Sequence, residues 1–233
     1  MVDFYGKCGT SNAGVRITFD GLNLQCIDGV WSRDAADYGS FKDSRDGRVY
    51  KTIQIGNQVW MAENLRYKAT GNTWCPDNNF SAAACETDGV LYDWATALAL
   101  PSEANSIIYD LADTANHQGI CPDGWRVPTE TDWEELAEGR ALEDLRLPTN
   151  YLDTVSTNKY GFSAKNVGYV YVWYRNGIDR VEEFTTPTRY WTTSQNTYEI
   201  RNTGNAIYVI DVYNGKRSYI WKENGNALRC IKK

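Results

Sequence analysis

Alternating apolar and polar positions predict two β-hairpins near the start of the chain. Residues 15–19 and 22–26 alternate on either side of an Asp-Gly turn, and residues 48–55 and 58–61 alternate on either side of a Gly-Asn turn. Alternation with a period of two turns one face of each strand toward a core and the other toward solvent. We therefore expect two antiparallel hairpins in this part of the chain.

The middle of the chain carries helical spacing instead. Residues 91–99 place apolar side chains on one face, so we expect a helix there. Thr129 precedes a second helical stretch and is followed three residues later by Asp132, which approximates a capping box. The acidic residues of this second stretch favour the positive end of a helix dipole, and we interpret them as a solvated face rather than as catalytic groups. Residues 70–87 have the composition of a loop.

Aromatic and β-branched residues dominate the last third of the chain, where Asn-Gly pairs separate them. Strands at both ends with two helices between them predict an α+β domain over residues 40–233. We expect the preceding residues 1–39 to form a small β-hairpin module that ends in a linker at residues 32–40. The late strands are expected at residues 169–174, 190–194, 206–213 and 218–221.

Composition narrows the class of protein. The chain has 233 residues, 42% hydrophobic and 23% charged, which is typical of globular proteins. Its net charge of −6 argues against nucleic-acid binding, which needs a basic surface. No apolar run approaches the roughly 18 residues of a transmembrane segment, so none is expected in this chain. The outlier is the aromatic content of nine Trp, sixteen Tyr and six Phe, and we expect part of this set to lie on the surface.

Six cysteines indicate disulfide bonds. No Cys-x-x-Cys motif occurs, and the single histidine lies far from any pair of cysteines, so a structural zinc site is not expected. The sequence alone does not select among the possible pairings. A Cys8–Cys26 bridge would clamp the small module, Cys75–Cys85 would form a local staple, and Cys121–Cys230 would tie the segment before the second helix to the last strand.

Disulfides persist in oxidising compartments, which predicts a secreted or cell-surface protein. The first residues have neither a basic start nor an apolar stretch, so we expect the export signal to lie outside this sequence.

Candidate catalytic groups are few. His117 lies in the polar stretch 114–119, which is typical of a solvated loop or helix end, and we expect no triad chemistry there. The acidic residues offer no pair with a defined separation for glycoside hydrolysis. We therefore expect no enzymatic activity and no cofactor.

Four blocks of the sequence resemble the Fibrobacter succinogenes major paralogous domain and occur in the order of that family. The small Cys-clamped module resembles a unit that often precedes this domain in surface proteins. The family is similar to C-type lectin-like domains, so the resemblance implies a twisted antiparallel sheet with two helices in a bacterial envelope or secreted protein. In that fold a cysteine before the second helix pairs with one near the last strand, as Cys121 and Cys230 would. The blocks are residues 43–65, 91–97, 121–129 with Trp133, and 190–194 continued by 228–230.

Departures from related families limit the function. Calcium-dependent lectins carry Glu-Pro-Asn or Gln-Pro-Asp loops and a Trp-Asn-Asp strand, none of which occurs here. Calcium takes about six to eight oxygen ligands, and the late carboxylates are too scattered to supply them. Asp43 and Asp46 resemble half of a calcium loop, but an Asp-Gly turn explains them, so we expect no metal site. Residues 126–134 resemble the helix entry of formylglycine-generating enzyme-like domains, yet that family's Asn-Val-Trp-Glu-Trp block and reactive late cysteines are missing.

The aromatic residues divide into two groups. Five tryptophans fall in or beside the family-like blocks and are expected in the core: Trp60, Trp94, Trp125, Trp133 and Trp191. The remainder concentrates in residues 169–174 and 198–221, among many Asn residues, and Tyr, Trp and Asn together are typical of binding loops. Tyr190 is counted with the late aromatic residues, and Trp191 stands at the edge of this group. We expect ligand binding through Trp173, Tyr198, Asn205, Tyr208, Tyr213, Arg217, Tyr219, Trp221 and Asn224.

These observations predict a non-catalytic binding module, outside the cell or on its surface, that recognises a glycan or a protein ligand. One alternative is a structural subunit or spacer of a bacterial surface assembly, which the attached Cys-clamped module favours. Another is a degenerate formylglycine-generating-like enzyme, which would require free thiols.

Overall fold

The fold is described from a computed structural model of the chain. The residues it describes are 8–19, 22–27, 29–34, 37–77, 81–147, 156–175, 178–184, 188–195, 206–211 and 216–233.

The N-terminal module is a three-stranded antiparallel sheet in the order β1-β2-β3, joined by the predicted Cys8–Cys26 disulfide. Cys8, Leu24, Cys26 and Trp31 form its small buried cluster. The linker predicted at residues 32–40 is wrong at both ends, because strand pairing continues into that stretch from either side. The elements are the 3₁₀ helix η1 (Thr10–Asn12), β1 (Arg16–Phe19), β2 (Leu22–Ile27) and β3 (Val30–Arg33), and the next strand, β4, already begins at Gly39.

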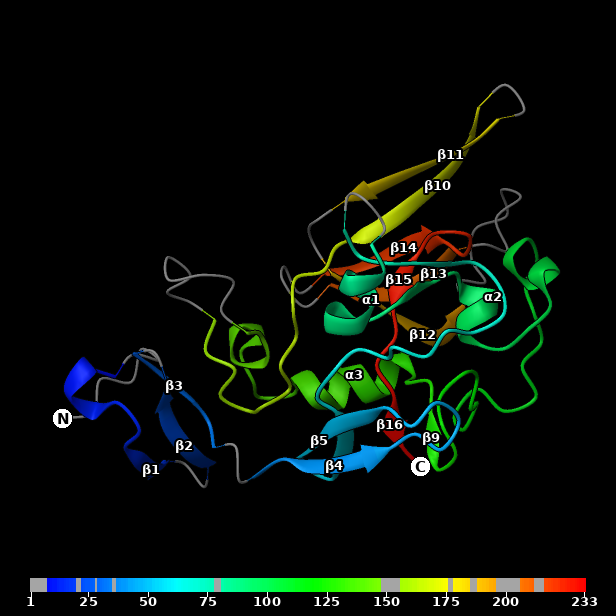
Figure 1. Ribbon diagram of the computed structural model, residues 1–233. Helices are drawn as coiled ribbons and strands as arrows, with labels where there is room; N and C mark the ends of the chain where they lie inside the picture. The colour runs from blue at the N-terminus through cyan, green and yellow to red at the C-terminus, as the bar shows by residue number, and fades with distance from the viewer. Residues whose placement is uncertain are drawn as a thin grey trace.

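The second hairpin belongs to a five-stranded antiparallel sheet in the order β4-β5-β6-β16-β9. The last strand in the sequence, β16, lies between β6 and β9, with Ile231 opposite both Trp60 and Arg126. The C-terminus is thus built into a sheet that begins near the N-terminal module (Figure 1). The strands are β4 (Gly39–Lys42), β5 (Val49–Ile55), β6 (Gln58–Met61), β9 (Trp125–Arg126) and β16 (Ile231–Lys232).

A six-stranded sheet in the order β14-β13-β12-β15-β8-β7 forms the other layer. All its pairings are antiparallel except β12 with β15, which meet at Tyr190 and Ala227. The hairpin β10–β11 projects from this sheet (Figure 1). The strands are β7 (Thr73–Trp74), β8 (Leu91–Tyr92), β10 (Tyr169–Arg175), β11 (Ile178–Phe184), β12 (Arg189–Gln195), β13 (Ala206–Asp211), β14 (Lys216–Trp221) and β15 (Asn226–Ala227).

Helix α3 (Glu130–Ala137) confirms the predicted capping box. The Thr129 hydroxyl accepts from the backbone N–H of Asp132, and the Asp132 carboxylate accepts from the backbone N–H of Thr129, at 3.1 and 2.7 Å. Trp133 and Leu136 of this helix share one core cluster with residues of both sheets. The helix therefore joins the two layers.

The other helical predictions need correction. Residues 91–99 contain only one helical turn, α2 (Trp94–Ala97), because Leu91 and Tyr92 pair as β8 and Asp93 caps the turn by accepting from the N–H of Thr96 at 2.7 Å. Residues 70–87 are not all loop, since they contain β7 and most of α1 (Ala82–Asp88), which is capped by Ser81. Two 3₁₀ helices complete the described elements, η3 (Ser102–Asn105) and η4 (Leu142–Leu145).

The core and the disulfides agree with the sequence. The five tryptophans expected in the core are all at most 3% exposed. The Cys75–Cys85 disulfide ties the end of β7 to α1, and Cys121–Cys230 ties the segment before β9 to β16, so all three predicted bridges are confirmed. The described chain is a mixed structure of curled antiparallel sheets with few helices, as expected for α+β. Within the described ranges, no helix is both long enough and apolar enough to cross a membrane.

Candidate binding surface

The first strand of the projecting hairpin has one buried face and one aromatic face. Val170 and Val172 are 0% and 9% exposed, whereas Tyr169 and Tyr171, which alternate with them, are half-buried. This is the period-two pattern of a strand that lies against a core on one side. The outer face of β10 therefore presents tyrosine rings.

Trp221 packs on this face. Its ring is stacked on that of Tyr171, with 5.7 Å between centroids and 24° between planes. It is 41% exposed and is the one exposed tryptophan among the side chains that the structure describes. Offset stacking of this kind contributes about 0.5–1.5 kcal/mol beyond burial, so Tyr171 holds the Trp221 ring in place.

Tyr169 extends the aromatic face along β10. Arg189, the first residue of β12, places its guanidinium carbon 3.7 Å from the centroid of the Tyr169 ring. A cation over an aromatic face is attracted by the quadrupole of the ring. Tyr169, Tyr171, Arg189 and Trp221 together define what we call the Trp221 surface.

Lys222, which directly follows Trp221 at the end of β14, points into the protein and anchors this end of the strand. It is 0% exposed, and its Nζ donates to the carbonyl oxygens of Ala104 and Ile107 and to Oε1 of Gln195 at 2.9, 2.7 and 2.7 Å. The same Nζ lies 3.9 Å from the centroid of the Trp94 ring. Burial lowers the pKa of Lys222 to about 7, whereas three acceptors and an aromatic face favour the ammonium form, which alone supplies three N–H donors. We therefore assign the ammonium form below neutral pH.

The turn after β14 docks β10 beside Trp221. Val170 exchanges two backbone hydrogen bonds with Gly225, at 2.8 and 2.9 Å. A Cβ at Gly225 would lie 2.6 Å from a ring carbon of Trp74, so only glycine fits this close approach. Asn224, a predicted ligand residue, is 1% exposed, and its Oδ1 accepts from the N–H of Val172 at 2.9 Å. The structure therefore places the Asn224 side chain inside the protein, where it joins strands, and not on the Trp221 surface.

The family model of the Fibrobacter succinogenes major domain matches residues 53–232. The chain belongs to this family. The match confirms the resemblance seen in the sequence, and it includes all four residues of the Trp221 surface. No curated protein and no solved structure matches the chain.

The remaining predicted ligand residues of this Fibrobacter succinogenes major domain are only partly described. Tyr208 of β13 and Tyr219 of β14 are direct partners in the strand register. Arg217 lies opposite Ile210 in the same pair of strands, and Trp173 lies opposite Arg180 in the hairpin. For these residues the structure describes the backbone alone. Tyr198, Asn205 and Tyr213 lie outside the described residues.

Two of the late aromatic residues belong to the core: Tyr190, and Trp191 at the edge of the predicted set. Both are 0% exposed, and Nε1 of Trp191 donates to the carbonyl oxygen of Tyr92 at 2.6 Å. Tyr171 and Lys222 were not singled out from the sequence. The alternation of Tyr169 to Tyr171 with valines could have indicated the outer face of β10, but no sequence signal marks a lysine as buried.

His117 and Asp132, two polar residues considered as catalytic candidates, both have hydrogen-bond partners within the fold. The His117 ring nitrogen Nε2 is hydrogen-bonded to the carbonyl oxygen of Leu98 at 2.8 Å. Burial alone would raise the pKa of Asp132, but hydrogen bonds from Arg126 and Thr129 hold that pKa below its ordinary value. Among the described residues, no group of three or more His, Cys, Asp or Glu side chains is arranged to hold a metal ion.

Proposed function

We propose that the chain is a non-catalytic extracellular binding module that holds a carbohydrate ligand on the Trp221 surface. The observation that carries the proposal is an exposed indole fixed from behind by the Tyr171 ring. A flat aromatic face can stack on the apolar face of a sugar ring. A ring that is already ordered loses little conformational entropy when the ligand binds.

The surroundings of Trp221 favour a fixed surface. Lys222 holds the inner side of the strand end by three hydrogen bonds, and Gly225 and Asn224 dock β10 against it. Arg189 adds a cation and the Tyr169 hydroxyl adds a polar group near the tyrosine face. Apolar stacking combined with a few positioned polar groups is the usual composition of small-ligand sites.

The proposed scaffold is a C-type lectin-like fold. Two observations support it: antiparallel sheets joined by a helix, and the Cys121–Cys230 disulfide between the segment before α3 and the last strand. The three disulfides also support an extracellular location, because such bonds persist in oxidising compartments. They engage every cysteine, so a formylglycine-generating-like oxidase would have no thiol in this structure.

A glycan array tests the proposal. Wild-type protein is expected to bind a restricted set of glycans, and Trp221→Ala is expected to bind the same set at least about tenfold more weakly, as for a central aromatic contact. Val49→Ala, which shortens another exposed apolar side chain, is the control and should bind as wild type does. Equal glycan binding by wild type and Trp221→Ala would contradict the proposed surface.

The two other hypotheses give different results in the same set of experiments. A protein ligand predicts no glycan binding but loss of partner capture in Trp221→Ala. A structural subunit predicts a stable oligomer in size-exclusion chromatography, no glycan binding and no effect of Trp221→Ala.

A further inference from the structure

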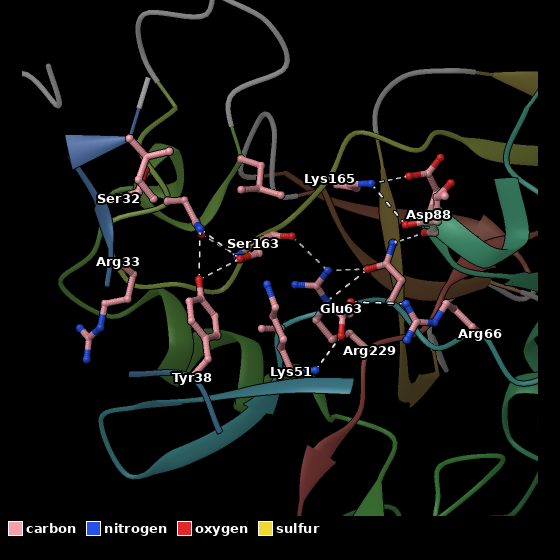
Figure 2. Close-up of a pocket in the computed structure, with 16 residues that line it drawn as sticks. Ser32, Arg33, Tyr38, Lys51, Glu63, Arg66, Asp88, Ser163, Lys165 and Arg229 are labelled. Atoms are coloured by element: carbon pink, nitrogen blue, oxygen red, sulfur yellow. Dashed lines mark hydrogen bonds and ion pairs between the residues drawn. The ribbon is translucent and has the colours of Figure 1, made fainter. Parts of the chain in front are cut away.

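A cavity of about 430 Å³ lies between strand β3 of the N-terminal module and later parts of the chain (Figure 2), and its lining contains no residue of the Trp221 surface. Ser32 and Arg33 of β3 line it from the module side, and Lys51 of β5, Asn64 and Arg229 line it from the domain side. This volume is in the range of sites that enclose small ligands.

A cluster of hydroxyl and amide groups in the cavity lining links Tyr38, near the N-terminal module, to Asn158 and Ser163. The Tyr38 hydroxyl and the Ser163 hydroxyl are 3.1 Å apart, and Nδ2 of Asn158 donates to both, at 3.3 and 3.0 Å. Figure 2 shows these groups facing one side of the cavity. The Ser163 hydroxyl donates to the carbonyl oxygen of Gly161 at 3.3 Å, so Tyr38 is the donor between the two hydroxyls. A hydroxyl can accept two hydrogen bonds, so the Tyr38 oxygen, which accepts from Asn158, retains one acceptor position for a polar ligand.

The charge of the cavity contrasts with that of the chain. Five basic and two acidic side chains line it, although the net charge of the whole chain is −6. Lys165 is paired with Asp88 at 2.6 Å and Arg66 with Glu63 at 3.4 Å, so both acidic side chains of the lining have a basic partner. Arg33 is paired with Asp37 at 2.7 Å. The lining therefore carries an excess of positive charge.

Arg229 forms the fixed part of that charge. It is 1% exposed, and its guanidinium donates to Oδ1 of Asn64 at 2.6 Å and to the carbonyl oxygens of Phe162 and Ser163. Its guanidinium carbon also lies 4.4 Å from the centroid of the Phe162 ring. These amide and carbonyl oxygens orient the guanidinium. Arg229 thus contributes a permanent positive potential to the cavity floor.

Lys51 supplies a movable cation. Its backbone N–H donates to the Glu63 carboxylate at 2.6 Å, while its Nζ lies 5.6 Å from the centroid of the Tyr38 ring. In Figure 2 its side chain stands beside Tyr38 and points into the cavity. An ammonium group on a flexible stem can reach an incoming anion and form a charge-assisted hydrogen bond.

We propose that this cavity binds a small polyhydroxylated carboxylate, of the size and chemistry of a hexuronate sugar. Lys51 would bind the carboxylate beside Arg229, and the Tyr38 oxygen would accept a hydrogen bond from a hydroxyl of the ligand. This is a second site, and it does not depend on the Trp221 surface.

Isothermal titration calorimetry at low salt tests the proposal with sodium D-galacturonate as the probe. The matched neutral sugar D-galactose tests the need for the charge, and sodium acetate tests the need for the hydroxyls. Galacturonate is expected to bind, and the other two are expected to bind at least about tenfold more weakly. Lys51→Gln should weaken galacturonate binding about tenfold or more, which is the usual effect of losing a hydrogen bond to a charged group. Lys68→Gln removes an exposed lysine outside the lining and should bind as wild type does.

Three results would overturn the proposal: no galacturonate binding by the wild type, equal binding of galacturonate with galactose or acetate, or equal binding by Lys51→Gln and Lys68→Gln. Thermal melting of both variants establishes that they are folded. Trp221→Ala should retain galacturonate binding, so this site and the Trp221 surface can fail separately.

Discussion

At the scale of single residues, Lys222 shows how a buried charge supports an exposed aromatic side chain. Burying an ammonium group is costly unless hydrogen bonds compensate it. Here three acceptors and the Trp94 ring surround Nζ. Two of the acceptors are carbonyl oxygens of residues 104 and 107, which lie in or just after η3, so one side chain fixes this segment, β12 and the end of β14.

The Lys222→Met variant tests this role. Methionine matches the length of the stem but takes the Lys222 donor from the carbonyl oxygens of Ala104 and Ile107, while Oε1 of Gln195 still accepts from the backbone N–H of Tyr109. We therefore expect a loss of about 2–4 kcal/mol in the free energy of unfolding. Urea denaturation measures that loss. Lys68→Met, at an exposed position, should stay within about 0.5 kcal/mol of wild type. A similarly small change in Lys222→Met would refute the anchoring role.

At the scale of elements, α3 depends on the carboxylate of Asp132. This side chain accepts from Arg126 at 2.6 and 2.7 Å and from the backbone N–H and hydroxyl of Thr129, both at 2.7 Å. The start of the helix is therefore tied to β9 by an ion pair and a cap. Trp133, the next residue, is then placed against Trp60 of β6, with 4.9 Å between ring centroids.

Acid should weaken this arrangement. The hydrogen bonds hold the pKa of Asp132 below its ordinary value, so the folded state binds the proton less readily than the unfolded chain does. The stabilisation is then complete above about pH 5, and it is lost as the pH falls from there through the ordinary carboxyl pKa of about 3.9 and then through the lowered pKa. The free-energy gap between wild type and Asp132→Asn should be about 1.5–3 kcal/mol at pH 7 and clearly smaller at pH 3. Urea unfolding at both pH values measures it, and a gap that does not change with pH would contradict the assignment.

At the scale of the whole molecule, the three disulfides close loops of very different length. Cys75–Cys85 spans 10 residues, whereas Cys121–Cys230 spans 109 and joins the middle of the chain to its last strand. A bridge that closes a longer loop restricts the unfolded chain more strongly.

Paired Cys-to-Ser variants separate the two bridges. Removing Cys121–Cys230 should cost about 4–5 kcal/mol and removing Cys75–Cys85 about 2–3 kcal/mol, following the loop lengths. Urea unfolding of the two double variants tests the order. An equal or reversed order would show that local packing, rather than chain entropy, determines the contribution of these bridges.

The sequence predicts the parts of this fold that local rules determine. The hairpins, the cap of α3 and the five core tryptophans follow from periodicity, turn chemistry and the family-like blocks. The sequence does not predict helix α1, because the helix is short and lies in a segment that has the composition of a loop. The candidate site was harder to predict, because the burial of Asn224 and Lys222 depends on contacts with residues 172 and 104, far away in the chain.

The most direct test of the central claim is the affinity for the best glycan found on the array, measured by titration calorimetry in wild type, Trp221→Ala and Tyr171→Ala. We expect Trp221→Ala to lose at least about tenfold in affinity, because the stacking surface is removed. We expect Tyr171→Ala to lose less, because it frees the indole without deleting it. Unchanged affinity in Trp221→Ala, with the variant folded, would contradict the assignment of the ligand to this surface.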